Sequence, residues 1–249
     1  MSFKIVVMSC DKNQDLWKPF YLCMEKYWKE HPEIIYSTET IANPYYQTIS
    51  KNIPISNWSK RICDTLKQID SDYVLIMVDD IFIRQPVDND KILGLIKNFE
   101  NQNVASINLE KSFDNQDKEY NQDLMVRSQN GKYKTSVMCN IYDRQKFIVI
   151  LEKLRVDPWT FEELNLHNNY TYLIAKRYEY LDFGYGDRKW FGIRKGKWCK
   201  EIKEFFKKEK IDIDLSIRGF YQWKYMSALL QKTNTYISTS GYLTISKLV

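Results

Sequence analysis

The stretch YVLIMVDDIFI, residues 73 to 83, sets the organisation of this chain. Tyr73 to Val78 form a continuous apolar and aromatic run, Asp79 and Asp80 follow together, and the apolar run resumes at Ile81. A short apolar run of this kind predicts a buried strand. Buried carboxylates are costly unless they are paired or hold a cation. Two carboxylates at the end of this strand therefore indicate a site, the alternative being that one caps a turn and the other is solvated.

Strands and helices are predicted to alternate around this stretch. Short apolar runs predict four strands over the first 110 residues, and apolar residues at helical spacing predict a helix between each pair. That order predicts a parallel sheet covered by helices on both faces. Ligands of such sheets bind outside the carboxyl ends of the strands, so Ser9–Asp11 should share one edge with the acidic pair. The predicted strands are residues 3–10, 33–37, 73–78 and 104–109, and the helices span 16–28, 58–69 and 88–99.

Helix caps and the second half of the chain complete this prediction. Ser56 or Asn57 and then Asp88 and Asp143 are candidate N-caps. Residues 132–142 predict a further strand, followed by a helix with Phe147, Ile150, Leu151 and Leu154 inside. Residues 156–179 should open with a Pro-Trp turn and become helical, and Trp198, Ile202 and Phe205 mark a basic helix. The segment 220–249 receives no prediction.

Composition and charge narrow the class of protein. The 249 residues carry a net charge of +5, and the five cysteines form no C-x-x-C pair. That spacing argues against a disulfide framework and a cysteine zinc site, and favours a reducing cytoplasm. The first 15 residues lack a secretory signal core or a membrane span. Residues 186–210 hold ten Lys or Arg against four Asp or Glu, which indicates an anionic ligand or surface, or a solvated helix face.

Several other chemistries lack their motifs. The sequence contains no G-x-x-x-x-G-K-[ST], no G-x-G-x-x-G after the first predicted strand and no G-x-S-x-G. Two histidines offer little for a nucleophilic triad. No nucleic-acid partner is expected, because the net charge is modest and no reading motif occurs.

A strand that ends in acidic residues, third in a β-α-β-α-β series, resembles the GT-A glycosyltransferases, whose acidic D-x-D motif holds a divalent cation against a nucleotide sugar. VVMSCDKNQDLW resembles the opening strand and loop of that family. TSVMCNIYDRQKFIVILEKLRVDPWTFEE resembles the acceptor-side segment of bacterial capsule, exopolysaccharide and lipopolysaccharide transferases. The resemblance covers roughly residues 3–200, and the motif departs from D-x-D because Asp79 and Asp80 are adjacent.

The resemblance implies a GT-A-like (Rossmann-like), mostly parallel α/β sheet flanked by helices, with an acceptor-side α+β extension. It implies one domain over 1–249, with a nucleotide-binding half (1–110), an acceptor-side half (111–210) and a C-terminal extension (211–249). Mn²⁺ or Mg²⁺ would bind Asp80, helped by Asp79. The implied nucleotide-binding residues are Ser9, Cys10, Asp11, Lys60, Arg61 and Asp79.

The acceptor side has its own candidates. Matching WTFE to the family's W-x-F-E gives Glu162 as catalytic base and Glu163 as fallback, which tilts the reaction toward inversion. The alternative is that both glutamates complement a helix dipole. Trp159 and Tyr142 are candidate acceptor platforms or core residues, and His167 could complete a metal shell or lie on the surface. Arg194, Lys195 and Lys197 could contact a diphosphate or an anionic membrane.

The predicted function is metal-assisted transfer of a sugar from a nucleotide-diphosphate sugar to a glycan or lipid-linked glycan, in the cytoplasm or at the inner face of the membrane. A nucleotidyltransferase on a similar sheet is the alternative enzyme. An inactive carbohydrate- or nucleotide-binding relative is the alternative without turnover.

Overall fold

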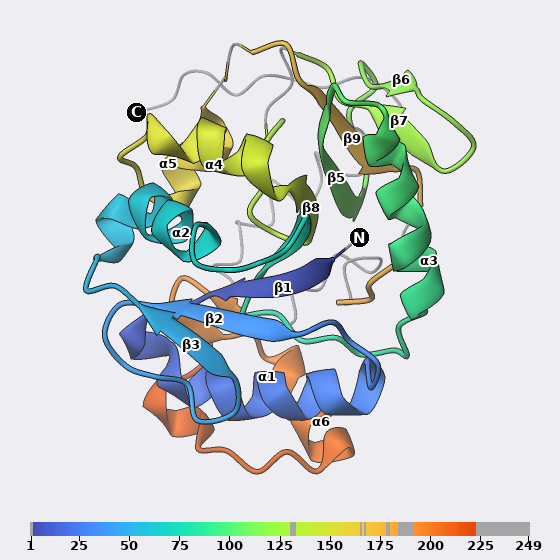
Figure 1. Ribbon diagram of the computed structural model, residues 1–249. Helices are drawn as coiled ribbons and strands as arrows, with labels where there is room; N and C mark the ends of the chain where they lie inside the picture. The colour runs from blue at the N-terminus through green and yellow to red at the C-terminus, as the bar shows by residue number, and fades with distance from the viewer. Residues whose placement is uncertain are drawn as a thin grey trace, which may run out of the picture.

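A nine-stranded mixed sheet forms the centre of the protein (Figure 1). The computed structural model describes residues 2–129, 133–164, 166, 168–177, 180–183 and 192–222. The strand order is β3-β2-β1-β4-β8-β5-β9-β7-β6. The strands are β1 (Phe3–Met8), β2 (Ile34–Thr38), β3 (Gln47–Ser50), β4 (Tyr73–Val78), β5 (Val104–Lys111), β6 (Lys118–Glu119), β7 (Leu124–Val126), β8 (Asn140–Asp143) and β9 (Thr171–Ala175).

Helices cover both faces of this sheet, which confirms the predicted fold class. Alternate residues of β1 point to opposite faces, so Ile5 and Val7 join one core cluster and Val6 and Met8 the other. The first cluster includes α1 (Gln14–Tyr27), α3 (Asn89–Leu95) and α6 (Glu201–Glu209). The second includes α2 (Trp58–Leu66), α4 (Arg144–Glu152) and α5 (Pro158–Glu163).

The sheet departs from the predicted parallel series at β8. β3, β2, β1 and β4 are parallel as expected. β8 lies between β4 and β5 and is antiparallel to both. Of the described residues in the predicted strand 132–142, only Asn140 to Tyr142 pair with the sheet, and β8 extends one residue further, to Asp143. β4 and β5 therefore run in the same direction with one antiparallel strand between them.

Two other local predictions were wrong. Residues 171–175, expected to be helical, form β9, which pairs parallel to β5. The sequence TYLIA is rich in aromatic and β-branched residues, which favour strands. β3 was not predicted, and Trp198 belongs to β11 (Lys197–Trp198), before α6 begins.

The predicted helix caps are confirmed at Asp88 and Asp143. Their side chains accept hydrogen bonds from the backbone N–H groups of Lys91 and Lys146. Asn57 occupies the N-cap position of α2 without a side-chain cap bond. Ser56 lies in the preceding 3₁₀ turn.

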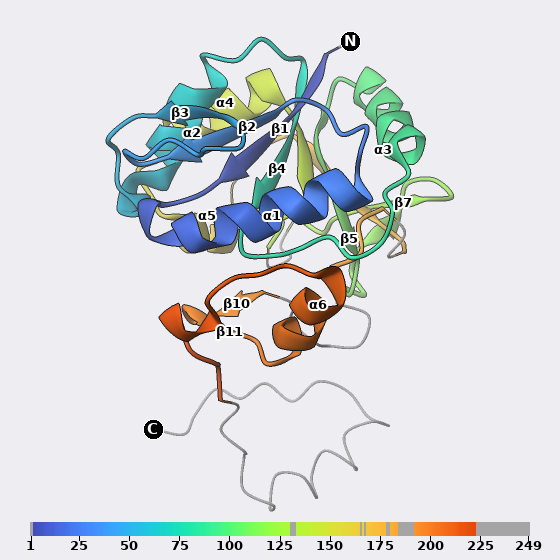
Figure 2. The ribbon, with the colours of Figure 1, turned by 90° about the horizontal axis from the view of Figure 1, so that it is seen from below.

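A small hairpin lies outside the carboxyl ends of the central strands (Figure 2). It consists of β10 (Ile193–Arg194) and β11, and α6 follows it. Figure 2 shows this unit at the end of the sheet toward which the arrows of β1 and β4 point. In the described part of the chain no helix is long and apolar enough to cross a membrane. Residues 184–191 and 223–249 lie outside the described part.

Candidate functional site at the carboxyl edge of the sheet

Asp79 is buried at the end of β4 and is held by three donors. Its side chain accepts hydrogen bonds from Ser9 Oγ (2.5 Å), Asn13 Nδ2 (3.0 Å) and Trp17 Nε1 (3.2 Å). Only 1% of Asp79 is exposed, and burial raises the pKa of its carboxyl to about 7. The contact with Ser9 brings the ends of β1 and β4 together, as the parallel sheet predicted.

Asp80 is fixed through its backbone rather than its side chain. Its carbonyl accepts a hydrogen bond from Ile193 N (3.2 Å), and Gly192 packs directly against it. Burial raises the pKa of the Asp80 carboxyl to about 6. Among the described residues no other side chain donates a hydrogen bond to this carboxylate. Asp80 is therefore the member of the pair whose carboxylate oxygens are available to bind a ligand.

Arg218 connects the acidic pair to the C-terminal part of the chain. It makes a bidentate ion pair with Asp15, at 2.6 Å for both contacts, and Nη2 also donates to Asn13 Oδ1 (3.0 Å). Asn13 in turn holds Asp79, and the charge of Arg218 lowers the pKa of Asp80 against the larger effect of burial. The sequence analysis missed both residues: Asn13 lies in the segment VVMSCDKNQDLW but was not singled out there, and Arg218 lies in no recognisable motif.

The predicted nucleotide-binding residues divide into two groups. Cys10 is partly exposed next to the site, and burial raises the pKa of its thiol to about 11, so it is protonated at neutral pH. Lys60 is partly exposed on α2 and pairs with Asp64 at 2.5 Å. Ser9 is buried, at 3% exposed, and holds Asp79.

Asp11 and Arg61 instead hold the loops around the edge. The Asp11 carboxylate accepts hydrogen bonds from the backbone N–H groups of Thr40 (3.0 Å) and Ile41 (3.1 Å). Arg61 is 0% exposed and donates to Ser9 O (2.7 Å) and Ile53 O (3.2 Å). A fully buried guanidinium cannot contact a ligand directly. Arg61 therefore acts by holding the backbone at Ser9 and Ile53 in place.

Glu39, which the sequence analysis also missed, joins the same loops. It follows β2 and accepts hydrogen bonds from the backbone N–H groups of Asp11 (3.1 Å) and Ile55 (2.9 Å). Its carboxylate lies 3.7 Å from Arg61 Nη1. Glu39 comes shortly after a predicted strand, at the edge of the sheet. That position is the sequence signal from which Glu39 could have been identified.

Glu162 is oriented by the turn that precedes β8. Its Oε1 accepts hydrogen bonds from Ser136 Oγ and Val137 N, both at 3.0 Å. Burial raises the pKa of Glu162, whereas Glu163 is exposed to solvent. Of the two candidates for the catalytic base, Glu162 is therefore the one that hydrogen bonds hold in a fixed orientation.

Glu110 is a further carboxylate that the sequence analysis did not identify. It lies at the end of β5, and burial, followed by the charge of Glu162, raises its pKa to about 7. The charge of Arg127 opposes both shifts. The strand VASINL followed by Glu repeats the pattern of β4 followed by its acidic pair, which was an available signal.

The two predicted aromatic platforms have opposite positions. Trp159 is 67% exposed on α5, as a ring that contacts a ligand must be. Tyr142 is 0% exposed, stacks on Phe147 at 3.8 Å and donates through its hydroxyl to Ser136 O (2.8 Å). A stacking platform must offer a free ring face, so the prediction for Tyr142 is wrong and its ring belongs to the core.

The predicted basic residues lie on the β10–β11 hairpin. Lys195 and Lys197 are exposed, and Lys195 and Gly196 turn the chain with φ angles of 49° and 74°. The Arg194 guanidinium lies 5.1 Å from the centre of the Tyr221 ring. The hairpin therefore presents two lysines near the contact between Ile193 and Asp80.

The donor set fits a cation that shares its shell with a substrate. Among the described residues no cluster of three His, Cys, Asp or Glu could hold a metal alone. Mg²⁺ typically uses one or two carboxylates together with waters and substrate phosphates. Both oxygens of Asp79 already accept hydrogen bonds, so Asp80 is the first ligand to consider. His167 lies outside the described residues.

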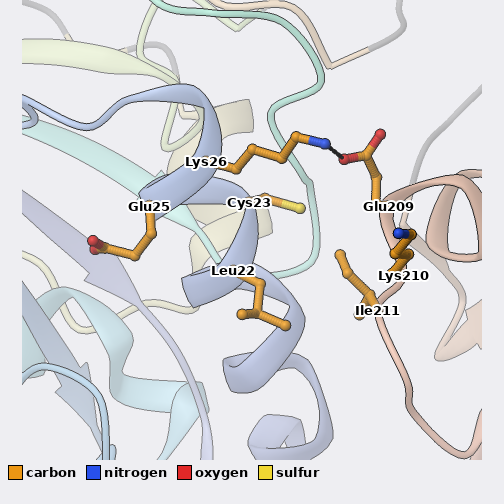
Figure 3. A pocket seen from close by; sticks show the side chains of 7 residues that line it. All are labelled: Leu22, Cys23, Glu25, Lys26, Glu209, Lys210 and Ile211. Carbon is orange, nitrogen blue, oxygen red and sulfur yellow. Dashed lines mark hydrogen bonds and ion pairs between the residues drawn. The ribbon is translucent and has the colours of Figure 1, made fainter.

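A cavity of about 360 Å³ lies elsewhere, between α1 and the end of α6 (Figure 3). Leu22, Cys23 and Ile211 line it, and the Lys26–Glu209 ion pair crosses its margin. None of the predicted site residues lines this cavity.

Comparison with known proteins finds distant structural neighbours and no sequence match. No protein-family model matches the sequence, and no curated protein matches it. Similar solved structures include S. aureus TarS 1–349, at 11% identity and a TM-score of 0.44, with 70% of this chain and 57% of that chain covered. TarS 1–349 in complex with UDP-GlcNAc is also among them. These structural neighbours include GT-A-type glycosyltransferases.

Two other structures complete this comparison. The galactosyltransferase LgtC, in complex with donor and acceptor sugar analogues, has 10% identity and a TM-score of 0.37, with 59% of each chain covered. A CMP:2-keto-3-deoxy-manno-octonic acid synthetase complexed with CTP has 12% identity and a TM-score of 0.42, covering 66% of this chain and 83% of that chain. This chain spans 57% of TarS 1–349 and 35% of a longer TarS chain. Likeness at TM-scores of 0.37 to 0.44 carries no conclusion about this chain.

Proposed function

We propose that this protein is a glycosyltransferase that moves a sugar from a nucleoside-diphosphate sugar to a hydroxyl group of a glycan or lipid-linked glycan. The observation that carries the proposal is the placement of two carboxylate groups on one edge of the sheet. Asp79 and Asp80 follow β4, while Glu110 lies at the end of β5, where the charge of Glu162 affects it. Sugar transfer needs a charge-neutralising centre for the leaving group and a proton acceptor for the attacking hydroxyl, and the two groups supply these roles.

The acidic pair would serve the donor. Asp80 would be the first protein ligand of Mn²⁺ or Mg²⁺, and Asp79 would keep the turn in place through its three hydrogen bonds. A bound divalent cation offsets the charge that develops on a leaving diphosphate. Lys195 and Lys197 on the hairpin would add positive charge for the diphosphate or for an anionic membrane surface. This supports action in the cytoplasm, at the inner face of a membrane where the acceptor is lipid-linked.

Glu162 would serve the acceptor. The acceptor oxygen forms a bond to the anomeric carbon, the bond from that carbon to the diphosphate oxygen breaks, and its electron pair leaves with the diphosphate. The proton of the acceptor hydroxyl passes to Glu162, whose Oε2 is not used by Ser136 or Val137. Direct attack of this kind inverts the anomeric configuration, and general-base catalysis contributes about 10²–10⁴-fold.

Binding and transfer assays test the two halves separately. UDP and GDP are titrated into wild type and Asp80→Ala with and without Mn²⁺, and we expect Mn²⁺ to strengthen binding only in wild type. Metal-indifferent binding that is unchanged in Asp80→Ala contradicts the role of the acidic pair. Glu162→Gln should lower transfer by about 10²–10⁴-fold while nucleotide binding persists. Glu30→Gln, at an exposed position beyond α1, is the matched control, and wild-type turnover in Glu162→Gln would refute the assignment.

The same assays separate the alternatives. A nucleotidyltransferase would release pyrophosphate from CTP or UTP in the presence of a sugar phosphate, and would usually use a Gly-rich loop after β1. The loop here, SCDKNQD, contains no glycine. A binding protein without turnover would bind a nucleotide sugar and neither hydrolyse nor transfer it.

A further inference from the structure

We propose that Lys134 is a positioning residue of the acceptor side, because its hydrogen bonds attach the turn that holds Glu162 to the segment that follows α5. The inference rests on the proposed glycosyl transfer, in which Glu162 accepts a proton. It deepens that function by naming the side chain that keeps Glu162 in place. Lys134 acts through the chain on either side of Glu162, so it is not itself a catalytic residue.

Lys134 begins a run of three consecutive side chains that donate hydrogen bonds to α5 and the segment after it. Its Nζ donates to the carbonyl oxygen of Leu166 (2.6 Å), beyond the end of α5. The next two side chains make bonds of the same kind, from Thr135 Oγ1 to Phe161 O (3.3 Å) and from Ser136 Oγ to Glu162 Oε1 (3.0 Å). All three donor residues are buried. The turn is therefore attached to the chain both before and after Glu162.

The Lys134 ammonium finds an acceptor for each of its three N–H groups. Besides Leu166 O, its Nζ lies 3.1 Å from Gln129 Oε1 and 3.4 Å from Gln129 O. The Gln129 amide donates through Nε2 to Tyr170 O (3.3 Å), which leaves its Oε1 for Lys134. The ammonium also lies 5.4 Å from the centre of the Tyr172 ring. A protonated lysine has three donors and no acceptor, so these contacts use its full capacity.

Lys134 is buried without a carboxylate partner. It is 2% exposed, and burial alone lowers its pKa, because no carboxylate of the described residues forms an ion pair with it. A buried charge is costly unless it is compensated, and a methionine would fill a similar space without that cost. The hydrogen bonds to Gln129 and Leu166 are therefore what a lysine adds at this position.

Both ends of this turn have a strained backbone, so the turn depends on its attachments. Tyr133 and Cys139, on either side of residues 134–138, have φ angles of 56° and 51°. Residues other than glycine persist in the left-handed region only where their surroundings impose it. Cys139 is fully buried, whereas Tyr133 is 50% exposed. The buried group beside Tyr133 is Lys134, and its hydrogen bonds fix that end of the turn.

Glu162 depends on this turn for its orientation. Ser136 Oγ and Val137 N both donate to Oε1, which leaves Oε2 for the proton of the acceptor hydroxyl in the proposed reaction. Misplacing a reacting group by about 1 Å can cost about 10²-fold in rate. Without the bond from Lys134 to Leu166, the turn is free to move away from α5, and Glu162 loses both its donors and its orientation.

Carboxyl titration by NMR tests this attachment without any substrate. Protein labelled with 5-¹³C-glutamate is titrated as wild type, as Lys134→Met and as the control Lys153→Met, at an exposed position. The signal absent from Glu162→Gln identifies Glu162. Hydrogen bonds to the ionised form lower a carboxyl pKa, so the Glu162 midpoint should move to higher pH in Lys134→Met and stay in place in Lys153→Met. An unchanged midpoint in Lys134→Met overturns the inference.

A milder variant keeps the test decisive if Lys134→Met folds poorly. Gln129→Leu removes one acceptor of the ammonium at an exposed position, and the Glu162 midpoint should move in the same direction by less. An unchanged midpoint there overturns the inference as well. The other titratable groups that interact with Glu162 are Arg127, Glu163, Glu110 and Tyr142, and these variants alter none of them.

Turnover in two backgrounds gives the functional readout. In Lys134→Met we expect kcat to fall by up to about 10²-fold while KM for the donor stays unchanged. In the Glu162→Gln background the same substitution should lower transfer little further, because the group that Lys134 positions is already gone. An equal loss in both backgrounds means that Lys134 serves the fold alone, and overturns the inference. Failure of the proposed function looks different: wild type then transfers no sugar from any donor, although the NMR titrations still report the attachment.

Discussion

Gly192→Ala is the substitution that most directly tests how the acidic pair is held. A Cβ at Gly192 would lie 1.7 Å from the Asp80 carbonyl oxygen and 2.8 Å from its carbon. Ordinary van der Waals contact begins at 3.4 Å, so the hairpin and the Asp80 backbone would have to separate by about 1.7 Å. The hydrogen bond from Ile193 N to Asp80 O, at 3.2 Å, would break. Gly192 also has a φ of 122°, which L-residues rarely adopt.

The cost follows from these three effects. Overpacking costs about 1–3 kcal/mol, the strained backbone about 1–3 kcal/mol and the lost hydrogen bond about 0.5–1.5 kcal/mol. We expect a loss of unfolding free energy of about 2.5–7.5 kcal/mol in total. At about 2–4 °C per kcal/mol for a chain of this size, the melting temperature should fall by roughly 5–30 °C. Mn²⁺-dependent UDP binding should weaken as well, because Asp80 moves.

Gly196→Ala provides the matched control in the same hairpin. Gly196 also has a positive φ, 74°, but an added Cβ there meets nothing within 4 Å. It therefore carries the backbone strain alone, about 1–3 kcal/mol. Differential scanning fluorimetry and calorimetric titration of UDP with Mn²⁺ compare the two variants. Equal melting temperatures with intact metal-dependent binding in Gly192→Ala would refute the view that the hairpin fixes Asp80.

Three further predictions concern the residues around the two carboxylate groups. Trp17→Phe removes the indole N–H that donates to Ser9 Oγ (2.8 Å) and Asp79 (3.2 Å). Urea unfolding should therefore show a loss of about 1–3 kcal/mol in unfolding free energy. A loss no larger than that of a substitution at an exposed position would contradict this prediction. Arg218→Lys loses the bidentate ion pair with Asp15, because an ammonium group cannot reproduce that geometry. Calorimetry should then show weaker binding of UDP in the presence of Mn²⁺. The control variant Arg155→Lys, at a surface position, should bind UDP as wild type does. The raised pKa of Glu110 means that the folded protein keeps this proton to higher pH than the unfolded chain. The stabilisation from the protonated Glu110 carboxyl is present below its ordinary pKa of 4.5 and is lost as the pH rises to about 7. The unfolding free energy of wild type should therefore fall over that pH window relative to that of Glu110→Gln. Parallel curves of unfolding free energy against pH for the two proteins would contradict this prediction.

Local signals predicted much of the first half of the fold. β1, β2, β4 and β5 are short apolar runs, and the cores of α1 and α2 repeat at helical spacing. The caps at Asp88 and Asp143 depend on neighbours three residues away, so the sequence alone contains them. The placement of β8 between β4 and β5 depends on pairing across more than 30 residues, and no local pattern encodes it.

The candidate site shows the same division. Asp79, Asp80 and Glu162 could be proposed as candidates because each lies in a distinctive local stretch. Trp17 was interpreted as a core residue from its spacing, and it is 2% exposed. Its position in the core also brings its one polar atom to Asp79, and spacing cannot predict that second role. Arg218 reaches Asp15 across 203 positions in the sequence, so only the folded chain brings them together.

β8 sets the distance between the donor and acceptor sides of the site. Neighbouring strands lie about 4.8 Å apart, so the ends of β4 and β5 are separated by roughly 10 Å with β8 between them. Because β8 is antiparallel, it brings to this edge the turn that precedes it, and that turn carries the donors to Glu162. A third parallel strand would instead end here and send its chain outward to a crossover helix. The antiparallel insertion therefore fills the gap with residues that orient Glu162, and in the proposed function the transferred sugar would lie between Asp80 and Glu162.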